Sequence, residues 1–246
     1  MSLLLVLGAA LFWFKQDTVL RAASQVKNNP PAAEGFYDAK DFLNGIVAGL
    51  SNGKKSANSK LPASYKLKVP FTPQAPYANW VLPYEEACEE ASALIVDYFW
   101  KGKTFTPLTA DKELLKIVAW EKKTFGDYIH TDVNQTVRLI KEYFGYKNVR
   151  VLQNPTVEQI KQEVVAGRPV IVPSAGRQLG NKYFKTPGPI YHMYVITGFS
   201  GSEFITNDPG TKRGEGYRYA MDVVMSAMHD WAGTEDNIDQ GRKAVI

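Results

Sequence analysis

Four residues of the chain have the types and the order that attack of a thiol on a carbonyl requires. Gln74 comes first, followed by Cys88, the only cysteine among the 246 residues, and then by His192 and Asp208. A cysteine attacks as its thiolate, and a free thiol with a pKa of about 8.5 is mostly protonated at neutral pH. A nucleophilic cysteine therefore needs a helix N-terminus or an imidazolium beside it. An imidazole in turn needs an acceptor that fixes its tautomer, and an aspartate can provide one.

The surroundings of Cys88 favour and oppose a thiolate at the same time. The apolar period of residues 84–100, "YEEACEEASALIVDYFW", predicts a helix with Cys88 in its first turns, where unpaired backbone N–H groups favour negative charge. The glutamates at positions 85, 86, 89 and 90 act the other way and raise the thiol pKa. Because helices favour glutamate in their first turns, we expect these four side chains to cap the helix and to be solvated. A histidine partner must therefore outweigh the effect of these four negative charges on the thiol pKa.

His192 and Asp208 are predicted to meet on a hairpin. His192 opens the segment "HMYVITGF", and Asp208 closes "EFITNDPG", with "SGS" between them. A turn of this composition between alternating apolar residues predicts two antiparallel strands, and the start of the first then lies beside the end of the second. The other two histidines, His130 and His229, have no carboxylate in so suitable a place. We expect both to be surface residues.

Gln74 could supply an oxyanion donor, since its amide N–H₂ lies upstream of the cysteine, with the backbone N–H of Cys88 as the second donor. Each signal by itself also has an ordinary structural explanation. A lone cysteine is often a buried small apolar residue, a strand histidine is usually structural, and "DPG" is a common turn. The ordered set of glutamine, cysteine, histidine and aspartate favours catalysis over these separate explanations.

The periodicity of the chain places these residues on two unlike halves. The first half is predicted to be helical and carries the cysteine, whereas the second is predicted to be mainly antiparallel strands and carries the histidine and the aspartate, an α+β arrangement with a cleft between the halves. Helices are predicted at residues 84–100, 111–124, 132–143, 156–167 and 219–231. In the helix at 156–167, Thr156 is the predicted N-cap and Gly167 ends the helix. Strands are predicted at 65–70, 148–152, 168–175 and in the hairpin of 191–210.

The N-terminal part differs in composition from the rest. Residues 1–14 contain the apolar run "LLLVLGAALFWF" and are interpreted as a signal or anchor segment, because the run is too short to span a bilayer but suits a signal peptide. Residues 15–68 are interpreted as a linker or tether, and 69–246 as the catalytic-size domain. We expect an extracytoplasmic protein, secreted or attached to a membrane through residues 3–14. A buried or surface-docked N-terminal helix is the alternative.

Charge and cysteine count exclude several classes. The 29 basic and 25 acidic side chains give a net charge of +4, and the excess lies in the N-terminal tail, which argues against a nucleic-acid partner for the folded part. No cysteine–histidine cluster with zinc-ligand spacing is present, so we expect no metal and no cofactor. Lys212, Arg213 and Arg218 follow Asp208 in a predicted loop. They are interpreted as a solvated rim or, alternatively, as a site for a carboxylate-bearing substrate.

The motifs "VPFTPQ…ACEEASALIVDYF…HMYVITGF…FITNDPG" resemble those of the C39-like cysteine peptidases, the papain-like group named after bacteriocin-processing peptidase domains. The resemblance runs from about Val69 to Trp231. It implies a papain-like fold in which a helical lobe packs against an antiparallel β-sheet lobe, with Gln74 as the oxyanion glutamine, Cys88 as the nucleophile, His192 as the general base and Asp208 as the orienting residue. The typical member has Cys-Gly-Pro-Thr where this chain has "CEEA".

The sequence therefore predicts a cysteine peptidase-type hydrolase that cleaves a peptide or amide bond through a Cys-His-Asp triad and a thioester intermediate. The expected partner is a peptide or protein substrate. Two alternatives remain open: a cell-wall peptide amidase or endopeptidase, and a catalytically inactive peptide-binding module of the same fold. The oligomeric state is not predicted.

Overall fold

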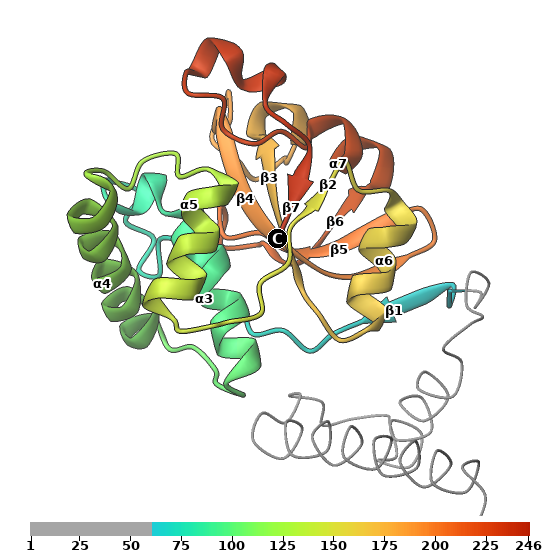
Figure 1. The fold of residues 1–246 in the computed structure, drawn as a ribbon, viewed down its shortest axis with the longest axis horizontal. Coiled ribbons are helices and arrows are strands. Elements are labelled where there is room, and N and C mark those ends of the chain that lie inside the picture. The colour runs from blue at the N-terminus through green and yellow to red at the C-terminus, as the bar shows by residue number, and fades with distance from the viewer. Residues whose placement is uncertain (1–60) are drawn as a thin grey trace, which may run out of the picture.

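The computed structural model describes residues 61–246. The predicted signal or anchor segment at 1–14, and all but the last eight residues of the predicted linker, lie outside the described residues. The described part has a helical half and a sheet half that pack side by side (Figure 1), so the predicted α+β architecture is confirmed. None of the helices in residues 61–246 combines the length and the apolar character that crossing a membrane requires.

The helical half starts with a short 3₁₀ turn and contains the three helices predicted between residues 84 and 143. It consists of η1 (Tyr84–Glu86), α3 (Cys88–Trp100), α4 (Pro107–Phe125), α5 (Val133–Arg138) and the π-helical turn η2 (Leu139–Tyr143). The α-helix that carries the cysteine begins four residues later than its apolar period predicts, because a 3₁₀ turn occupies Tyr84–Glu86. Cys88 is therefore the first residue of α3. α4 begins earlier than predicted because Thr106 and Thr109 form a capping box around Pro107.

The sheet half is built around one long strand. The main sheet contains β1 (Ser64–Lys66), β3 (Val170–Ala175), β4 (Tyr191–Ser200), β5 (Glu203–Asn207) and β6 (Glu215–Ala220), all antiparallel to their neighbours, in the order β1-β4-β5-β6 with β3 also pairing β4. β3 pairs the first part of β4, and β1 pairs its last part along the same edge. β1 lies before the predicted domain start at residue 69.

Shorter elements close the sheet half. A two-stranded sheet joins β2 (Leu152–Gln153) to β7 (Ala244–Val245), and the remaining helices are α6 (Val157–Val165), η3 (Gly176–Leu179), α7 (Met221–Ala227) and η4 (Glu235–Gln240). Thr156 caps α6 through a capping box, and Gly167 follows its end with a φ of 83°, both as predicted. The prediction of a helix over 219–231 is wrong at both ends. Tyr219 and Ala220 complete β6, and α7 ends at Ala227.

The hairpin between β4 and β5 has the predicted turn. Ser200 pairs with Glu203, and Gly201 between them has a φ of 58°, which glycine adopts without the strain that a side chain would bring. A register shift between Ile196 and Gly198 kinks β4 at the point where β3 gives way to β1. The hairpin brings the first residues of β4 next to the end of β5.

α3 lies at the centre of the core, between the sheet and α4. Leu94 and Ile95 are fully buried, as are Tyr194 and Phe199 of β4 against which the helix packs. Because α3 is covered on more than one side, its polar residues are buried as well. Glu89 is 1% exposed and Glu90 is 0% exposed. The expectation that these two glutamates are solvated is wrong, although Glu85 and Glu86 do reach solvent.

A pair of buried carboxyl groups joins α3 to α4. Glu90 and Glu121 face each other, and no other donor reaches their oxygens within the described residues. Two carboxylates repel, whereas a carboxylic acid donates a hydrogen bond to a carboxylate, so the pair holds a proton. Burial, above all, raises the pKa of Glu90 well above its usual value and that of Glu121 to about 8. Folding of the helical half is therefore coupled to the binding of protons by these two carboxyl groups.

This proton uptake makes stability depend on pH. Because the folded pKa of Glu121 is raised from 4.5 to about 8, its stabilising contribution is fully present below 4.5 and is lost as the pH rises through 8. We expect the free energy of unfolding to fall between these limits by an amount on the order of a few kcal/mol. Glu121→Gln should flatten this fall, as measured by urea unfolding at a series of pH values. The half-exposed Glu113 lies on the same helix, and Glu113→Gln should leave the slope unchanged.

The contact between β1 and β4 depends on a missing side chain. A Cβ atom at Gly198 would lie 2.5 Å from the carbonyl oxygen of Tyr65, which is too close for a carbon atom and a carbonyl oxygen without a shift of the backbone. We expect Gly198→Ala to lower the free energy of unfolding by about 1–3 kcal/mol by forcing β1 away from β4. Ser202→Ala, in the exposed turn of the same hairpin, is the control and should change it little. Equal stability of the two variants in urea would contradict this view of β1.

Candidate functional site

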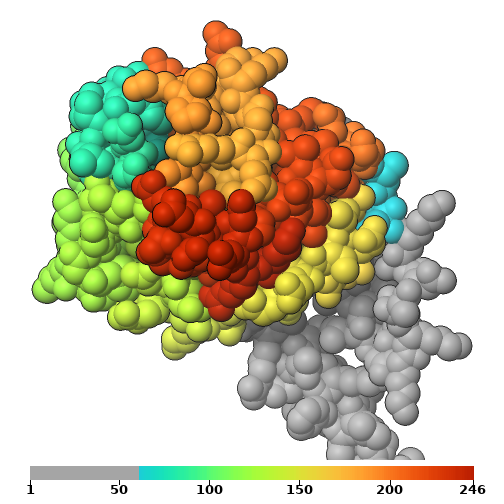
Figure 2. All heavy atoms as spheres, turned by 90° about the horizontal axis from the view of Figure 1, so that it is seen from above, coloured from blue at the N-terminus to red at the C-terminus, as the bar shows by residue number. Residues whose placement is uncertain are grey.

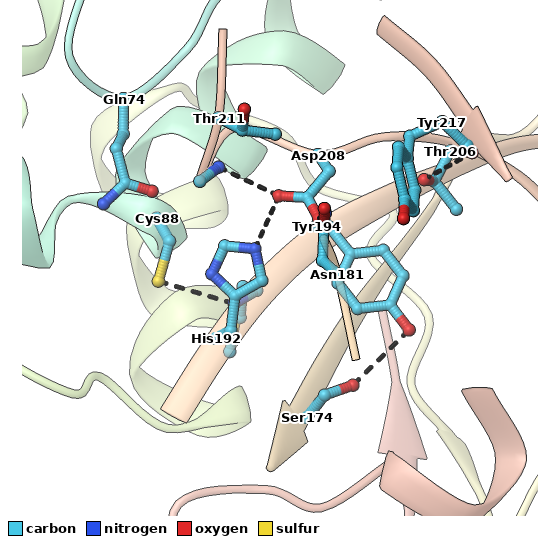
Figure 3. A network of polar contacts seen from close by, with 12 residues as sticks. Gln74, Cys88, Ser174, Asn181, His192, Tyr194, Thr206, Asp208, Thr211 and Tyr217 are labelled. Carbon is cyan, nitrogen blue, oxygen red and sulfur yellow. Dashed lines mark hydrogen bonds and ion pairs between the residues drawn. The ribbon is translucent and has the colours of Figure 1, made fainter. Parts of the chain in front are cut away.

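Cys88 lies where the helical half meets β4. Its Sγ atom accepts a hydrogen bond from the backbone N–H of Met193, with 3.4 Å between the two atoms, and lies 2.9 Å from Oε2 of Glu89. The sulfur therefore touches the peptide group that joins His192 to Met193, and Figure 3 shows the thiol beside the imidazole. Cys88 is 5% exposed. The predicted juxtaposition of thiol and imidazole across the two halves is present, in a closed arrangement.

His192 and Asp208 meet as the hairpin predicts. Nε2 of His192 is 2.7 Å from Oδ1 of Asp208, and both side chains are buried. A carboxylate can only accept in this contact, so Nε2 carries a proton, and in the neutral form of the ring Nδ1 has the lone pair. In Figure 3 the second ring nitrogen is on the side of Cys88. The imidazole is thus held in the tautomer that can take a proton from the thiol.

The second oxygen of Asp208 has its own donors. Oδ2 accepts from the hydroxyl of Tyr219 at 2.5 Å and from Nδ2 of Asn181 at 3.0 Å, while Oδ1 also accepts from the backbone N–H of Gly210. Burial alone would raise the pKa of Asp208, but the neighbouring His192 and these donors outweigh it and hold that pKa below its usual value. Sequence reasoning missed Asn181 and Tyr219. Most of β6, the strand that carries Tyr219, was predicted as a loop, and only its last two residues were assigned to a helix. Asn181 lies in a loop without regular spacing.

Two glycines allow the loop after Asp208 to fold tightly around the site. A Cβ atom at Gly214 would lie 1.7 Å from the carbonyl oxygen of Asp208, and one at Gly210 would lie 2.8 Å from Cε1 of His192. Phe184 packs edge-on against the imidazole, with 5.1 Å between ring centroids. The histidine is therefore enclosed by this loop and by the segment that follows η3.

Gln74 is close to the site, but its amide is engaged elsewhere. Its Nε2 donates to the carbonyl oxygens of Tyr84 and Glu85, each at 2.9 Å, and its backbone N–H donates to Pro209. Two carbonyl acceptors fix which end of the amide is the nitrogen, so both amide hydrogens are used. The side-chain oxygen is buried without a partner in the described residues. The oxyanion role of Gln74 stays a prediction that requires this amide to turn.

The electrostatics of the pocket keep the thiol protonated. Burial raises the pKa of Cys88 well above its usual value, and the charge and hydrogen bond of Glu89 raise it further, whereas the Met193 N–H lowers it. These effects outweigh the favourable position at the start of α3. In the resting protein, the side chain of Cys88 is a neutral thiol.

The other two histidines are not the surface residues that the sequence predicts. The side chain of His130 is 17% exposed and packs on Trp231, with 4.3 Å between ring centroids, because the backbone turns at this residue with a φ of 55°. Burial lowers the pKa of His130. His229 lies beyond the end of α7, where its Nδ1 contacts the carbonyl oxygen of Gly241 at 2.9 Å. Both residues hold the C-terminal segment in place.

Basic side chains and a small depression lie on segments next to the site residues in the sequence. Arg213 lies 5.0 Å from the ring centre of Tyr183, and Lys182 lies 5.1 Å from it, whereas Arg218, which was predicted in a loop, lies in β6 and pairs with Glu203. The loop between Gln74 and η1 holds a depression of about 80 Å³, lined by Ala75, Pro76, Tyr77, Asn79 and Tyr84. Figure 2 shows the teal segment and the light orange segment near 175–190 side by side on one face. Residues 61–246 contain no group of three or more potential metal ligands.

Comparison with known proteins supports one family. The model of the Peptidase_C39 like family matches residues 66–238. A solved structure from Bacillus anthracis, described as a C39-like peptidase, has 18% sequence identity to the chain and a TM-score of 0.49, over 75% of this chain and 96% of the other. No curated protein matches the chain. Because the family model extends over more than half of the sequence, with Gln74, Cys88, His192 and Asp208 all inside the match, the chain belongs to the Peptidase_C39-like family.

Proposed function

We propose that this protein is a cysteine peptidase-type hydrolase that cleaves a peptide or amide bond, with Cys88 as the nucleophile, His192 as the general base and Asp208 as the orienting residue. Family membership supports the peptidase class. The observation that carries the residue roles is the 2.7 Å contact of His192 with Asp208 beside a thiol that touches the Met193 N–H. Thiol, imidazole and carboxylate follow one another in the order that proton transfer requires.

The proposed reaction begins with proton transfer. The S–H bond of Cys88 breaks, the proton goes to Nδ1 of His192, and the thiolate attacks the substrate carbonyl carbon. The resulting oxyanion accepts a hydrogen bond from the backbone N–H of Cys88, which has no intrahelical partner because Cys88 is the first residue of α3. The imidazolium then protonates the departing amine, which leaves a thioester on Cys88. Water, deprotonated by His192, hydrolyses this thioester and restores the thiol.

Gln74 is proposed as the second oxyanion donor. The proposal requires its amide to leave the carbonyl groups of Tyr84 and Glu85, which belong to η1, just before the nucleophile. A shift of η1 would free the amide and widen access to Sγ together. Substrate binding in the neighbouring depression of the same loop is a suitable cause for such a shift.

We further propose a peptide or protein substrate and a location outside the cytoplasm, secreted or held at a membrane through residues 3–14. The apolar run of that segment supports the location. An inactive peptide-binding module is the second candidate function. It is favoured by the low exposure of Cys88 and by the "CEEA" sequence, which puts glutamates beside the thiol.

Labelling of the thiol separates the hydrolase from the binding module. We expect the full chain to react with iodoacetamide at mildly acidic pH faster than a free thiol does, because His192 can accept the proton of Cys88. His192→Ala should largely abolish this labelling, and Asp208→Asn should weaken it. The rates can be followed by mass spectrometry of the alkylated protein. A parent rate no higher than that of a free thiol, unchanged in His192→Ala, would support the binding module.

The donor from Tyr219 tests the role of Asp208. The Asp208 pKa is lowered, so its contribution to stability is present above the usual value of 3.8 and is lost as the pH falls through the lowered value. Tyr219→Phe removes one donor, and we expect the acid limit of His192-dependent labelling to move to higher pH and stability to fall by about 1–3 kcal/mol. Tyr217→Phe is the matched control. Tyr217 packs on Tyr219 with 4.7 Å between ring centroids, so this change should leave that limit in place.

A further inference from the structure

Glu89 lies in direct contact with the proposed nucleophile. Its Oε2 is 2.9 Å from Sγ of Cys88, and its Oε1 is buried with no partner in the described residues. The backbone N–H of Met193 also donates to this sulfur. A thiol at Cys88 can donate to Oε2, and a protonated Glu89 can donate to Sγ, so the two groups can share a proton at this distance. The carboxyl group of Glu89 is therefore part of the chemistry of the sulfur and not merely of its packing.

Thiol and carboxyl group cannot both be ionised in this position. Two negative charges less than about 3 Å apart in a buried site repel strongly, so the pair holds at most one. A carboxyl group is intrinsically more acidic than a thiol, so the first charge belongs to Glu89. Burial raises the pKa of Glu89 well above its usual value, and the charge of Glu90 raises it further, so the neutral acid persists to higher pH than in water. Once Glu89 is ionised, a thiolate beside it is disfavoured.

We propose that Glu89 acts directly on the nucleophile: its carboxyl group must carry a proton for Cys88 to become a thiolate, so this side chain sets the alkaline limit of the reactivity of the sulfur. In the reactive form, the proton of Cys88 passes to Nδ1 of His192, and the O–H of Glu89 donates to the thiolate. In the inactive form, Glu89 is a carboxylate and accepts the S–H of Cys88. The inference takes Cys88 as the nucleophile of the proposed function but does not require that peptides are the substrate.

Other groups around the pair bear on the same titration. Glu121 of α4 interacts electrostatically with Glu89. Two histidines lie near the pair: His192 of β4, and His130, whose Nδ1 is 3.6 Å from Oε2 of Glu86. The titratable groups that face Cys88 and Glu89 are Glu86 of η1, Glu90 of α3, Glu121 of α4, Tyr128 of the segment between α4 and α5, and Tyr191 and His192 of β4.

The test is the pH profile of Cys88 alkylation in the full chain, with iodoacetamide as the probe. In the parent, we expect the rate to rise, pass through a maximum and fall on the alkaline side as Glu89 loses its proton. Glu89→Gln keeps a donor but cannot ionise, so its rate should not fall on that side. Between about pH 6 and about pH 9, the ratio of variant to parent rate should rise about tenfold or more, the factor that corresponds to one pKa unit.

Glu90→Gln is the matched control, because Glu90 is equally buried and next in the sequence but does not touch the sulfur. In Glu90→Gln, the rate of Cys88 alkylation should still fall on the alkaline side. Profiles of Glu89→Gln and the parent that superimpose, or a variant that is slower at every pH, would overturn the inference. If Glu89→Gln does not fold, the pH profile of the parent protein is the test. A parent alkylation rate that keeps rising with pH into the range of an ordinary thiol would also overturn the inference. Hydrolysis is not measured, so failure to find a peptide substrate leaves this result intact.

Discussion

The structure depends on the dry contact between the start of α3 and the start of β4. Each half of the molecule brings one of the proposed reacting groups to this contact, the thiol of Cys88 from the helical half and the imidazole of His192 from the sheet half. Little water reaches either group, so each charge near them interacts more strongly than it would at the surface. Any ionisation at this contact has to be balanced by a partner. The hydrogen bonds of Asp208 and the proton held between Glu90 and Glu121 contribute to that balance.

This constraint explains why the site is closed and why the thiol of Cys88 is neutral at rest. A thiolate alone would be costly here, and the paired carboxyl groups of α3 and α4 add negative charge that must be neutralised by protons. The same closure occupies the amide of Gln74 with carbonyl groups of η1. The amide of Gln74 is thus held by the segment that leads directly to Cys88.

The sequence predicted those parts that depend on local periodicity. The hairpin of β4 and β5 follows from alternation and a glycine turn, which is why the meeting of His192 with Asp208 could be foreseen. The burial of Glu89 could not, because an amphipathic period shows which face of α3 is apolar but not that a second helix covers the other face. Tyr219 was missed for a related reason: β6 has few apolar residues, and only its pairing with β5 makes it a strand. The catalytic roles of Cys88, His192, Asp208 and Gln74 stay predictions.

The hydrogen bond from Met193 to the sulfur is made by the main chain. Only a substitution by proline can remove a backbone donor, so no other change of side chain along β4 abolishes this hydrogen bond. The position of the sulfur is therefore determined by the backbone of the strand. The residues around the cysteine are then free to vary in chemistry while the sulfur keeps its place beside the histidine. A scaffold of this kind can retune the acidity of its thiol, as glutamates in place of small neutral residues would do, without rebuilding the geometry on which attack depends.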